Sequence, residues 1–178
     1  KHAGKVVHIP LDDHEGQPGC INMAILKEKL EQYKDRINYI AMTGVSNVTG
    51  IINPIYEIAE LAHQYGALIL VDGAQMVAHI PIQISGHSNP LRNIDALVFS
   101  GHKTYVPGSP GVVICRKDIL SSMEPEEVGG GMVDQVHIDK YTISDQFPDR
   151  EEAGTPNIPG AIGLAAAIDV LDKIGIEF

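Results

Sequence analysis

Two short apolar runs, residues 68–71 and 96–99, constrain most strongly what this chain can fold into. They read Leu-Ile-Leu-Val and Ala-Leu-Val-Phe, and continuous apolar runs of this length are typical of strands buried on both faces of a parallel sheet. Polar residues follow each run directly: Asp72-Gly73-Ala74-Gln75 after the first and Ser100-Gly101-His102-Lys103 after the second. Because ligands of open α/β sheets bind outside the carboxyl ends of parallel strands, we expect both polar sets to face one crevice.

Helical and strand patterns alternate along the rest of the chain. Apolar periodicity predicts helices over residues 22–34, 54–65 and 160–173, and further strands over residues 6–9, 37–42 and 112–115. Asn53 suits the N-cap of the second helix, Pro54 suits its first turn, and Gly66 suits its end. The repeated order of strand, helix and strand predicts parallel strands with right-handed crossovers. The composition of residues 76–93 predicts a loop on the surface, and the sequence of residues 117–146 favours no regular element.

Composition limits the class of protein. The length of 178 residues fits one domain with a sizeable core. A net charge of −10 argues against a nucleic acid or an anionic membrane as the main partner. No run approaches the roughly 20 apolar residues that a bilayer requires, and no secretion signal opens the sequence. With Cys20 and Cys115 expected to be free thiols, a cytoplasmic protein is predicted.

Neither end of the sequence has the features of a natural terminus. The chain starts at Lys1 without an initiator methionine, and it stops at Phe178 just after a helical pattern ends. We therefore expect residues 1–178 to be a single domain core from a longer protein.

Lys103 and Asp72 are the residues with the most distinctive chemistry. A lysine amine at the end of a buried strand can lose its proton more easily than in water and then attack carbonyl groups. A carboxylate at the end of the neighbouring strand suits a cationic ring nitrogen, and the two together fit pyridoxal phosphate. Two alternatives stay open from these residues alone: Lys103 as a solvated loop residue, and Asp72 as a ligand of a metal or a ribose.

Three motifs in this order resemble the class V aminotransferase family, which includes cysteine desulfurases and selenocysteine lyases. They are Asp72-Gly73-Ala74-Gln75, Ser100-Gly101-His102-Lys103 and Glu152-Ala153-Gly154-Thr155-Pro156-Asn157. Residues 46–54 and 129–132 are also similar to the family. The resemblance implies the large domain of the aspartate aminotransferase fold (fold type I), a mostly parallel sheet between helices, with an antiparallel strand after Lys103.

The resemblance also implies roles for the residues that would hold the cofactor ring. Lys103 would bind pyridoxal phosphate as a Schiff base and later move protons at the α-carbon of the substrate. Asp72 would keep the pyridine nitrogen protonated, so that the ring can accept electrons. Gln75 would bind the phenolic oxygen of the ring.

The remaining implied roles concern the phosphate, the substrate and a second subunit. Ser100 and His102 would bind the phosphate, because hydroxyl and imidazole donors at a turn suit an anion. Asn47 would contact the substrate carboxylate or the ring edge. Thr155 would reach the cofactor phosphate of the neighbouring subunit, which implies a homodimer.

Desulfuration or selenium elimination from a cysteine-type amino acid is the first choice of reaction, with a sulfur-acceptor protein as the expected partner. Transamination or epimerisation of another amino acid is the second. Neither Cys20 nor Cys115 occupies the place of the desulfurase nucleophile. The sequence departs from the family pattern at residues 85–93, at Val106 and at Ser109-Pro110, so the substrate stays open. Two rivals are a binding module that holds the cofactor without turnover and a nucleotide or metal hydrolase that uses Asp72 with Asp95. No glycine-rich phosphate motif follows the first predicted strand, which disfavours the hydrolase.

Overall fold

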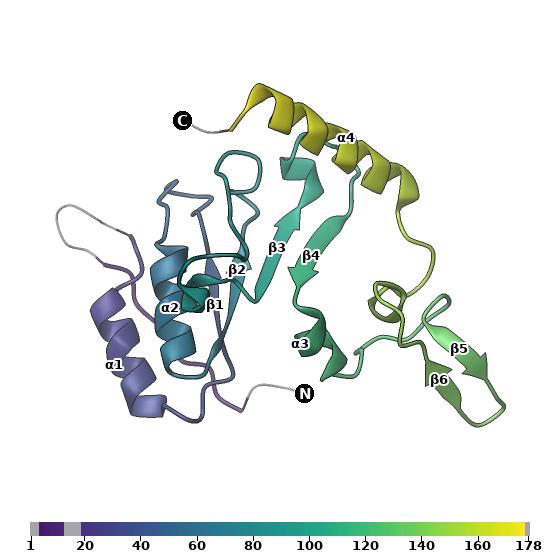
Figure 1. Ribbon diagram of the computed structural model, residues 1–178, viewed down its shortest axis with the longest axis horizontal. Helices are drawn as coiled ribbons and strands as arrows, with labels where there is room; N and C mark the ends of the chain where they lie inside the picture. The colour runs from purple at the N-terminus through teal and green to yellow at the C-terminus, as the bar shows by residue number, and fades with distance from the viewer. Residues whose placement is uncertain (1–3, 13–18, 177–178) are drawn as a thin grey trace.

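The computed structural model describes residues 4–12 and 19–176, which form an α/β fold around a four-stranded sheet (Figure 1). The strands of this sheet are β1 (Tyr39–Thr43), β2 (Leu68–Asp72), β3 (Ala96–Ser100) and β4 (Gly111–Cys115), and they lie side by side in this order. The helices are α1 (Met23–Tyr33), α2 (Ile55–Gln64), α3 (Lys117–Ser121) and α4 (Ile158–Ile174). A separate hairpin of β5 (Val133–Val136) and β6 (Tyr141–Ile143) projects from the body of the molecule.

The pairing of the strands confirms the predicted topology. β1 and β2 are parallel, with Thr43 opposite Asp72, and β2 and β3 are parallel, with Asp72 opposite Val98. β4 runs antiparallel to β3 and places Gly111 opposite Ser100. The two apolar runs are therefore neighbouring strands whose carboxyl ends meet at one edge of the sheet.

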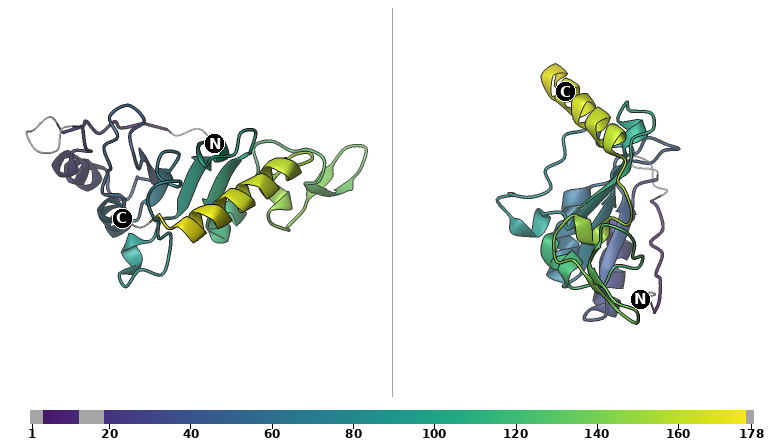
Figure 2. Two further views of the ribbon diagram at one scale, coloured as in Figure 1. Left: turned by 90° about the horizontal axis from the view of Figure 1, so that it is seen from above. Right: turned by 90° about the vertical axis from the view of Figure 1, so that its right-hand side faces the viewer.

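One face of the sheet carries the main core. Ile69, Val71 and Leu97 point to this face, where they form a buried cluster with side chains of α1 and α2, including Leu30 and Ile58. The opposite face is more open, because Tyr39 at the start of β1 keeps 54% of its surface exposed. In the two predicted runs, the residues on that face are still covered, because Ala96 is 8% exposed and Leu70 and Val98 are half-buried. The prediction of burial on both faces therefore holds in full for the core face and in part for the other. Both early helices pack on the same side of the sheet, as the views in Figure 2 show.

The helix ends test the capping predictions. Asn22 caps α1 by accepting a 2.9 Å hydrogen bond from the amide of Ile25. Asn53 is not the side-chain cap of α2: its amide oxygen accepts from Ile21 N at 3.0 Å and its Nδ2 donates to Thr43 O at 2.9 Å. Gly66 ends α2 as predicted, in the left-handed region at φ +70°, a conformation that glycine adopts without steric cost.

Other predictions need correction. Residues 6–9 form no strand, and they lie mostly exposed ahead of an isolated bridge between Leu11 and Ile21. α3 and the β5–β6 hairpin were missed, because their side chains are largely exposed and so leave no buried periodicity in the sequence. The helix predicted over residues 160–173 is confirmed as α4, which begins two residues earlier. Within the described residues, no helix combines the length and apolar character needed to cross a bilayer.

Candidate functional site

The carboxyl ends of β1, β2 and β3 bring three polar side chains to one face of the sheet. Thr43 lies opposite Asp72, and Asp72 lies opposite Val98. Because side chains alternate along a strand, Ser100 points to the same face as Val98. Thr43, Asp72 and Ser100 therefore share the open face of the sheet, away from α1 and α2.

The backbone holds these strand ends close together. Gly44 N donates to Asp72 O at 2.8 Å, and Gly73 N donates to Val98 O at 2.8 Å. Asp72 is exposed, and its Oδ1 accepts a 2.9 Å hydrogen bond from the amide of Ala74. A Cβ atom at Gly73 would stand 2.7 Å from Leu97 Cδ1, so a larger residue there would displace the side chain of Leu97. Asp72 therefore lies at the end of a tightly packed strand.

Lys103 lies in a short 3₁₀ helix, Gly101–Lys103, that begins where β3 stops. This turn is fastened to the start of β4 by a hydrogen bond from Gly101 N to Pro110 O at 3.2 Å. Thr104 is fully buried directly after the turn, whereas Lys103 is half-buried and His102 is exposed. Tyr105 adopts a left-handed backbone at φ 63°, which is costly for a residue with a side chain. The segment that carries Lys103 is therefore anchored on both sides and locally strained.

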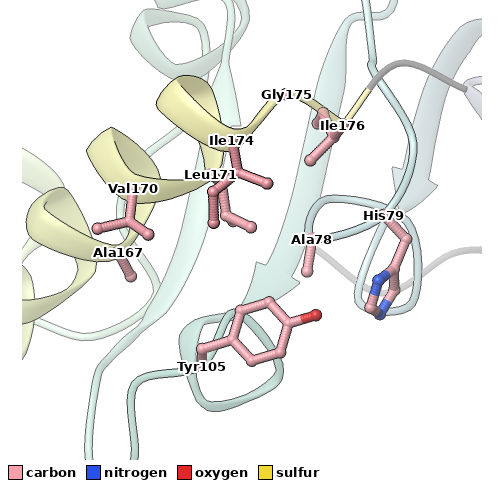
Figure 3. A pocket seen from close by; sticks show the side chains of 9 residues that line it. All are labelled: Ala78, His79, Tyr105, Ala167, Val170, Leu171, Ile174, Gly175 and Ile176. Carbon is pink, nitrogen blue, oxygen red and sulfur yellow. The ribbon is translucent and has the colours of Figure 1, made fainter.

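α4 crosses the same end of the molecule (Figure 1). Its cap, Asn157, accepts from Gly160 N at 3.0 Å and donates from Nδ2 to Gly108 O at 2.6 Å. An apolar pocket of about 520 Å³ lies between α4 and the loops after β2 and β3 (Figure 3). The pocket is lined by Ala78, His79, Tyr105, Ala167, Val170, Leu171, Ile174, Gly175 and Ile176. This pocket contains none of the predicted cofactor residues, so the candidate site is defined by the strand ends and not by the pocket.

Three predicted site residues lie away from the strand ends themselves. Gln75 is half-buried in the turn after β2. Asn47 is exposed in the loop after β1, which a bridge between Val45 and Ile52 closes. Thr155 is exposed two residues before Asn157. The structure places Asn47 and Gln75 at the carboxyl edge of the sheet. The hydrogen bond from Asn157 to Gly108 links the segment that carries Thr155 to this edge.

The glycine run at residues 129–131 supports the segment that leads to Thr155. Gly154 N donates to Gly130 O at 2.8 Å, and a Cβ atom at Gly129 would stand 3.2 Å from Ala153 Cβ. The run therefore permits close approach of two backbones.

The residues at the strand ends fit a phosphate-bearing cofactor. An amine, a carboxylate, a hydroxyl and an imidazole are contributed by Lys103, Asp72, Ser100 and His102, and among the described residues these side chains form no hydrogen bonds with one another. Beside them, the Oγ atom of Ser109 is buried without a hydrogen-bond partner in the described part of the chain. An unpaired buried hydroxyl is uncommon, and it adds one more polar group to the Lys103 turn.

Asp95 is a buried acid at the opposite edge of the sheet. It directly precedes β3, is 3% exposed, and accepts from His63 Nε2 and Arg116 Nη1, each at 2.8 Å. The carboxylate of Asp95 binds the amide of Ile69, which precedes Asp72 by three residues in β2. Three residues of a strand span about 10 Å. Asp95 and Asp72 do not converge, which contradicts the rival hydrolase that would use them together. No periodic pattern in the sequence predicts this network, because its members come from separate segments.

Charge and burial perturb the groups around Asp95. Hydrogen bonds to Asp118 and then Asp95 raise the pKa of Arg116, and the same guanidinium lowers the pKa of the exposed Asp118. Burial, and more weakly the charge of Asp95, raise the pKa of the Cys115 thiol. Within residues 4–12 and 19–176, no group of three or more histidine, cysteine or acidic side chains is arranged to hold a metal ion.

Comparison with known proteins gives a consistent result. The family described as "Aminotransferase class-V" matches residues 1–178. A cysteine desulfurase of Enterobacter sp. (strain 638) is 44% identical over 151 residues, which are 84% of this chain and 36% of that protein. A cysteine desulfurase of Synechococcus elongatus is 40% identical over 169 residues, which are 95% of this chain and 25% of that protein. The chain thus spans about a quarter to a third of the length of these relatives.

Solved structures share the same fold. The cysteine desulfurase CsdA from Escherichia coli superposes with a TM-score of 0.81 at 34% identity, covering 96% of this chain and 39% of that one. The apo cysteine desulfurase from Thermococcus onnurineus NA1 superposes with a TM-score of 0.82 at 35% identity, covering 97% of this chain and 40% of that one. The relative positions of the strands and of the motifs between them therefore match those of solved relatives.

Proposed function

Since this chain belongs to the aminotransferase class-V family, we propose that it forms the cofactor-binding core of a pyridoxal-phosphate enzyme acting as a cysteine desulfurase. The observation that carries the proposal is the meeting of Asp72 and the Ser100–Lys103 turn at adjacent strand ends, in a chain about 40% identical to cysteine desulfurases. Residues 1–178 would be the central part of the large domain of a longer protein. The partial coverage of the relatives supports this reading.

When bound, pyridoxal phosphate supplies an aldehyde for amino groups and a ring that accepts electrons from the α-carbon. Lys103 would hold the cofactor covalently through Nζ and then move a proton at the α-carbon of the substrate. Asp72, on its rigid strand end, would hold a proton on the ring nitrogen. Gln75 would bind the phenolic oxygen, and Ser100 and His102 would donate to the phosphate.

The substrate and partners follow from the same proposal. A cysteine-type amino acid would enter beside Asn47, which is exposed in the loop after β1. Thr155 is also exposed, and in a homodimer it would reach the phosphate held by the second subunit. Cys115 pairs with Ala96 at the far edge of the sheet, so neither it nor Cys20 is assigned as the sulfur-accepting nucleophile. A sulfur-acceptor protein and a cytoplasmic location stay predictions.

An absorbance titration of the full-length gene product with pyridoxal phosphate tests the cofactor assignment. Borohydride reduction followed by peptide mapping should fix the cofactor on Lys103. Lys103→Ala should abolish the visible band and the labelled peptide, whereas Lys117→Ala, which changes a lysine of α3, should preserve both. A band that survives in Lys103→Ala, or a label on another lysine, would contradict the assignment.

Assays with two amino acids test the reaction class. Sulfide release from cysteine by the full-length gene product supports the desulfurase, whereas amino transfer or racemisation with alanine would favour the alternative class V reactions. Binding of the cofactor without turnover of either amino acid would favour the binding module instead.

A further inference from the structure

Tyr105 has a strained backbone close to Lys103 and no role in the proposed function. Its φ of 63° lies in the left-handed region, which makes it an outlier for a bulky residue. Strain of this kind persists only where the surrounding structure holds it, and it is concentrated at functional sites. We propose that Tyr105 is a positioning residue, which packs on His79 and thereby sets the separation of Lys103 from Asp72. This inference rests on the proposed function.

The strain at Tyr105 needs an offsetting contact. Glycine would adopt this conformation without steric cost, so the tyrosine side chain contributes something that glycine cannot. Burial in the core is not that contribution, because 62% of Tyr105 stays exposed. The ring instead meets His79 edge to face, with 6.2 Å between the ring centroids and 88° between the planes, a geometry that aromatic pairs favour. Figure 3 shows both rings on the loops that face α4 across the apolar pocket.

The two rings connect the loops that carry the two halves of the candidate site. Tyr105 lies two residues after Lys103, and His79 lies seven residues after Asp72. The last hydrogen bond that continues the ladder between β2 and β3 is donated by Gly73 N, at 2.8 Å. Beyond it, no hydrogen bond joins the two loops within the part of the chain that the structure describes. The ring contact therefore holds the loops together where the backbone does not.

Short turns tie His79 to Asp72. His79 N donates to Met76 O at 2.8 Å, and Met76 N donates to Gly73 O at 2.8 Å. Gly73 directly follows Asp72 at the end of β2. A displacement of His79 is therefore passed through two hydrogen-bonded turns to the residue beside the acid.

A similar turn ties Tyr105 to Lys103. Thr104 N donates to Gly101 O at 2.9 Å, which closes the turn that contains Lys103, directly before Tyr105. A pyridoxal ring bound to both Lys103 and Asp72 would span the two loops, and its covalent structure fixes the distance between the two groups that they hold. The contact between the rings of Tyr105 and His79 would keep the loops at the separation that the cofactor requires.

Two substitutions of Tyr105 separate the role of the ring from that of the backbone. In the full-length gene product, Tyr105→Gly removes both the strain and the ring contact. Its cofactor-free form should melt close to the original protein, because the released strain offsets the lost contact. The visible band with pyridoxal phosphate, followed by stopped-flow absorbance, should form about tenfold more slowly, because the reacting groups are no longer held in place. Tyr105→Phe keeps the ring and should form the band at the original rate.

Two further variants assign the effect to the ring pair. Asp35→Gly relieves the same kind of strain, at φ 62° in the turn after α1, and should leave the rate unchanged. His79→Ala should slow the band as much as Tyr105→Gly does. The double variant should be no slower than either single variant, because the two residues act through one contact.

Several results would overturn the inference. They are an unchanged rate in Tyr105→Gly, an equal loss in Tyr105→Phe, and losses that add in the double variant. A melting temperature of Tyr105→Gly far below that of Tyr105→Phe would assign the residue to general stability and overturn it as well. Absence of the visible band in the original protein would instead contradict the proposed function, and the inference with it.

Discussion

Asp95 Oδ2 accepts a 2.9 Å hydrogen bond from the backbone amide of Ile69. The backbone pairing of β2 with β3 begins one residue later, at Leu70 and Ala96. The carboxylate therefore extends the ladder by one step at the amino end of β3 and contributes to the register that puts Asp72 opposite Val98. Because a slip of one residue would turn each side chain to the other face of the sheet, this contact bears on the placement of the candidate site.

Replacement of Asp95 is expected to be the most damaging change at this edge. Asp95→Ala leaves the amide of Ile69 without its partner and removes the acceptor for His63 and Arg116. Loss of these buried bonds should lower the free energy of unfolding by about 3 kcal/mol, measured by urea denaturation. Asp118→Ala removes the exposed partner of the same arginine and should have little effect. Equal losses for the two variants would contradict the assigned role of Asp95.

Gly101 should tolerate no larger residue. In Gly101→Ala the new methyl group meets Ser109 Oγ and the carbonyl oxygen of Pro110, the latter at 2.9 Å. The overpacked turn should lose about 1–3 kcal/mol of stability. Combination with Ser109→Gly should recover part of this loss, because the side-chain clash is removed and the backbone clash is not. A double variant no more stable than Gly101→Ala alone would show that the serine is not the obstacle.

Two substitutions of Asn157 separate its role as a cap from its role as a link. Asn157→Asp keeps the acceptor for Gly160 N but loses the donor to Gly108 O. Amide hydrogen exchange should therefore increase in the loop of residues 104–110 while the first turn of α4 stays protected. Asn157→Ala loses both contacts and should cost about 2 kcal/mol. If exchange in the loop is the same in the Asp variant and the original protein, α4 is not fastened through this bond.

Cys115 should react as a poorly ionised thiol. Burial first, and then the nearby charge of Asp95, raise its pKa, and the thiolate is the reactive form. In a Cys20→Ser variant, the pH at which alkylation by iodoacetamide reaches half its maximal rate should lie higher in the folded protein than in denaturant. The midpoint pH reports the ionisation of the thiol, whereas the maximal rate of alkylation also depends on how accessible the thiol is. A midpoint that does not move on unfolding would refute the raised pKa.

Local sequence signals were sufficient for much of the fold. The runs at residues 68–71 and 96–99 predicted β2 and β3, and their flanking polar residues lie at the expected edge of the sheet. The helix end at Gly66 was also predicted correctly. Signals of this kind depend on residues within one or two turns of each other, so the sequence alone carries them. The roles of the seven predicted site residues stay predictions, although the strand ends place several of them together.

Contacts between distant segments decided the rest. Asn53 has the side chain of a cap, yet it binds Ile21 and Thr43, which only the folded chain brings to it. Which face of the sheet the helices cover depends on the path of the crossovers, and no strand pattern specifies it. The exposed β5–β6 hairpin buries too little surface to leave a periodic signal. The sequence thus determined the strands and the chemistry at their ends, because both are local. The tertiary structure decided which groups were left unpaired, because the partner of a buried polar atom depends on long-range packing.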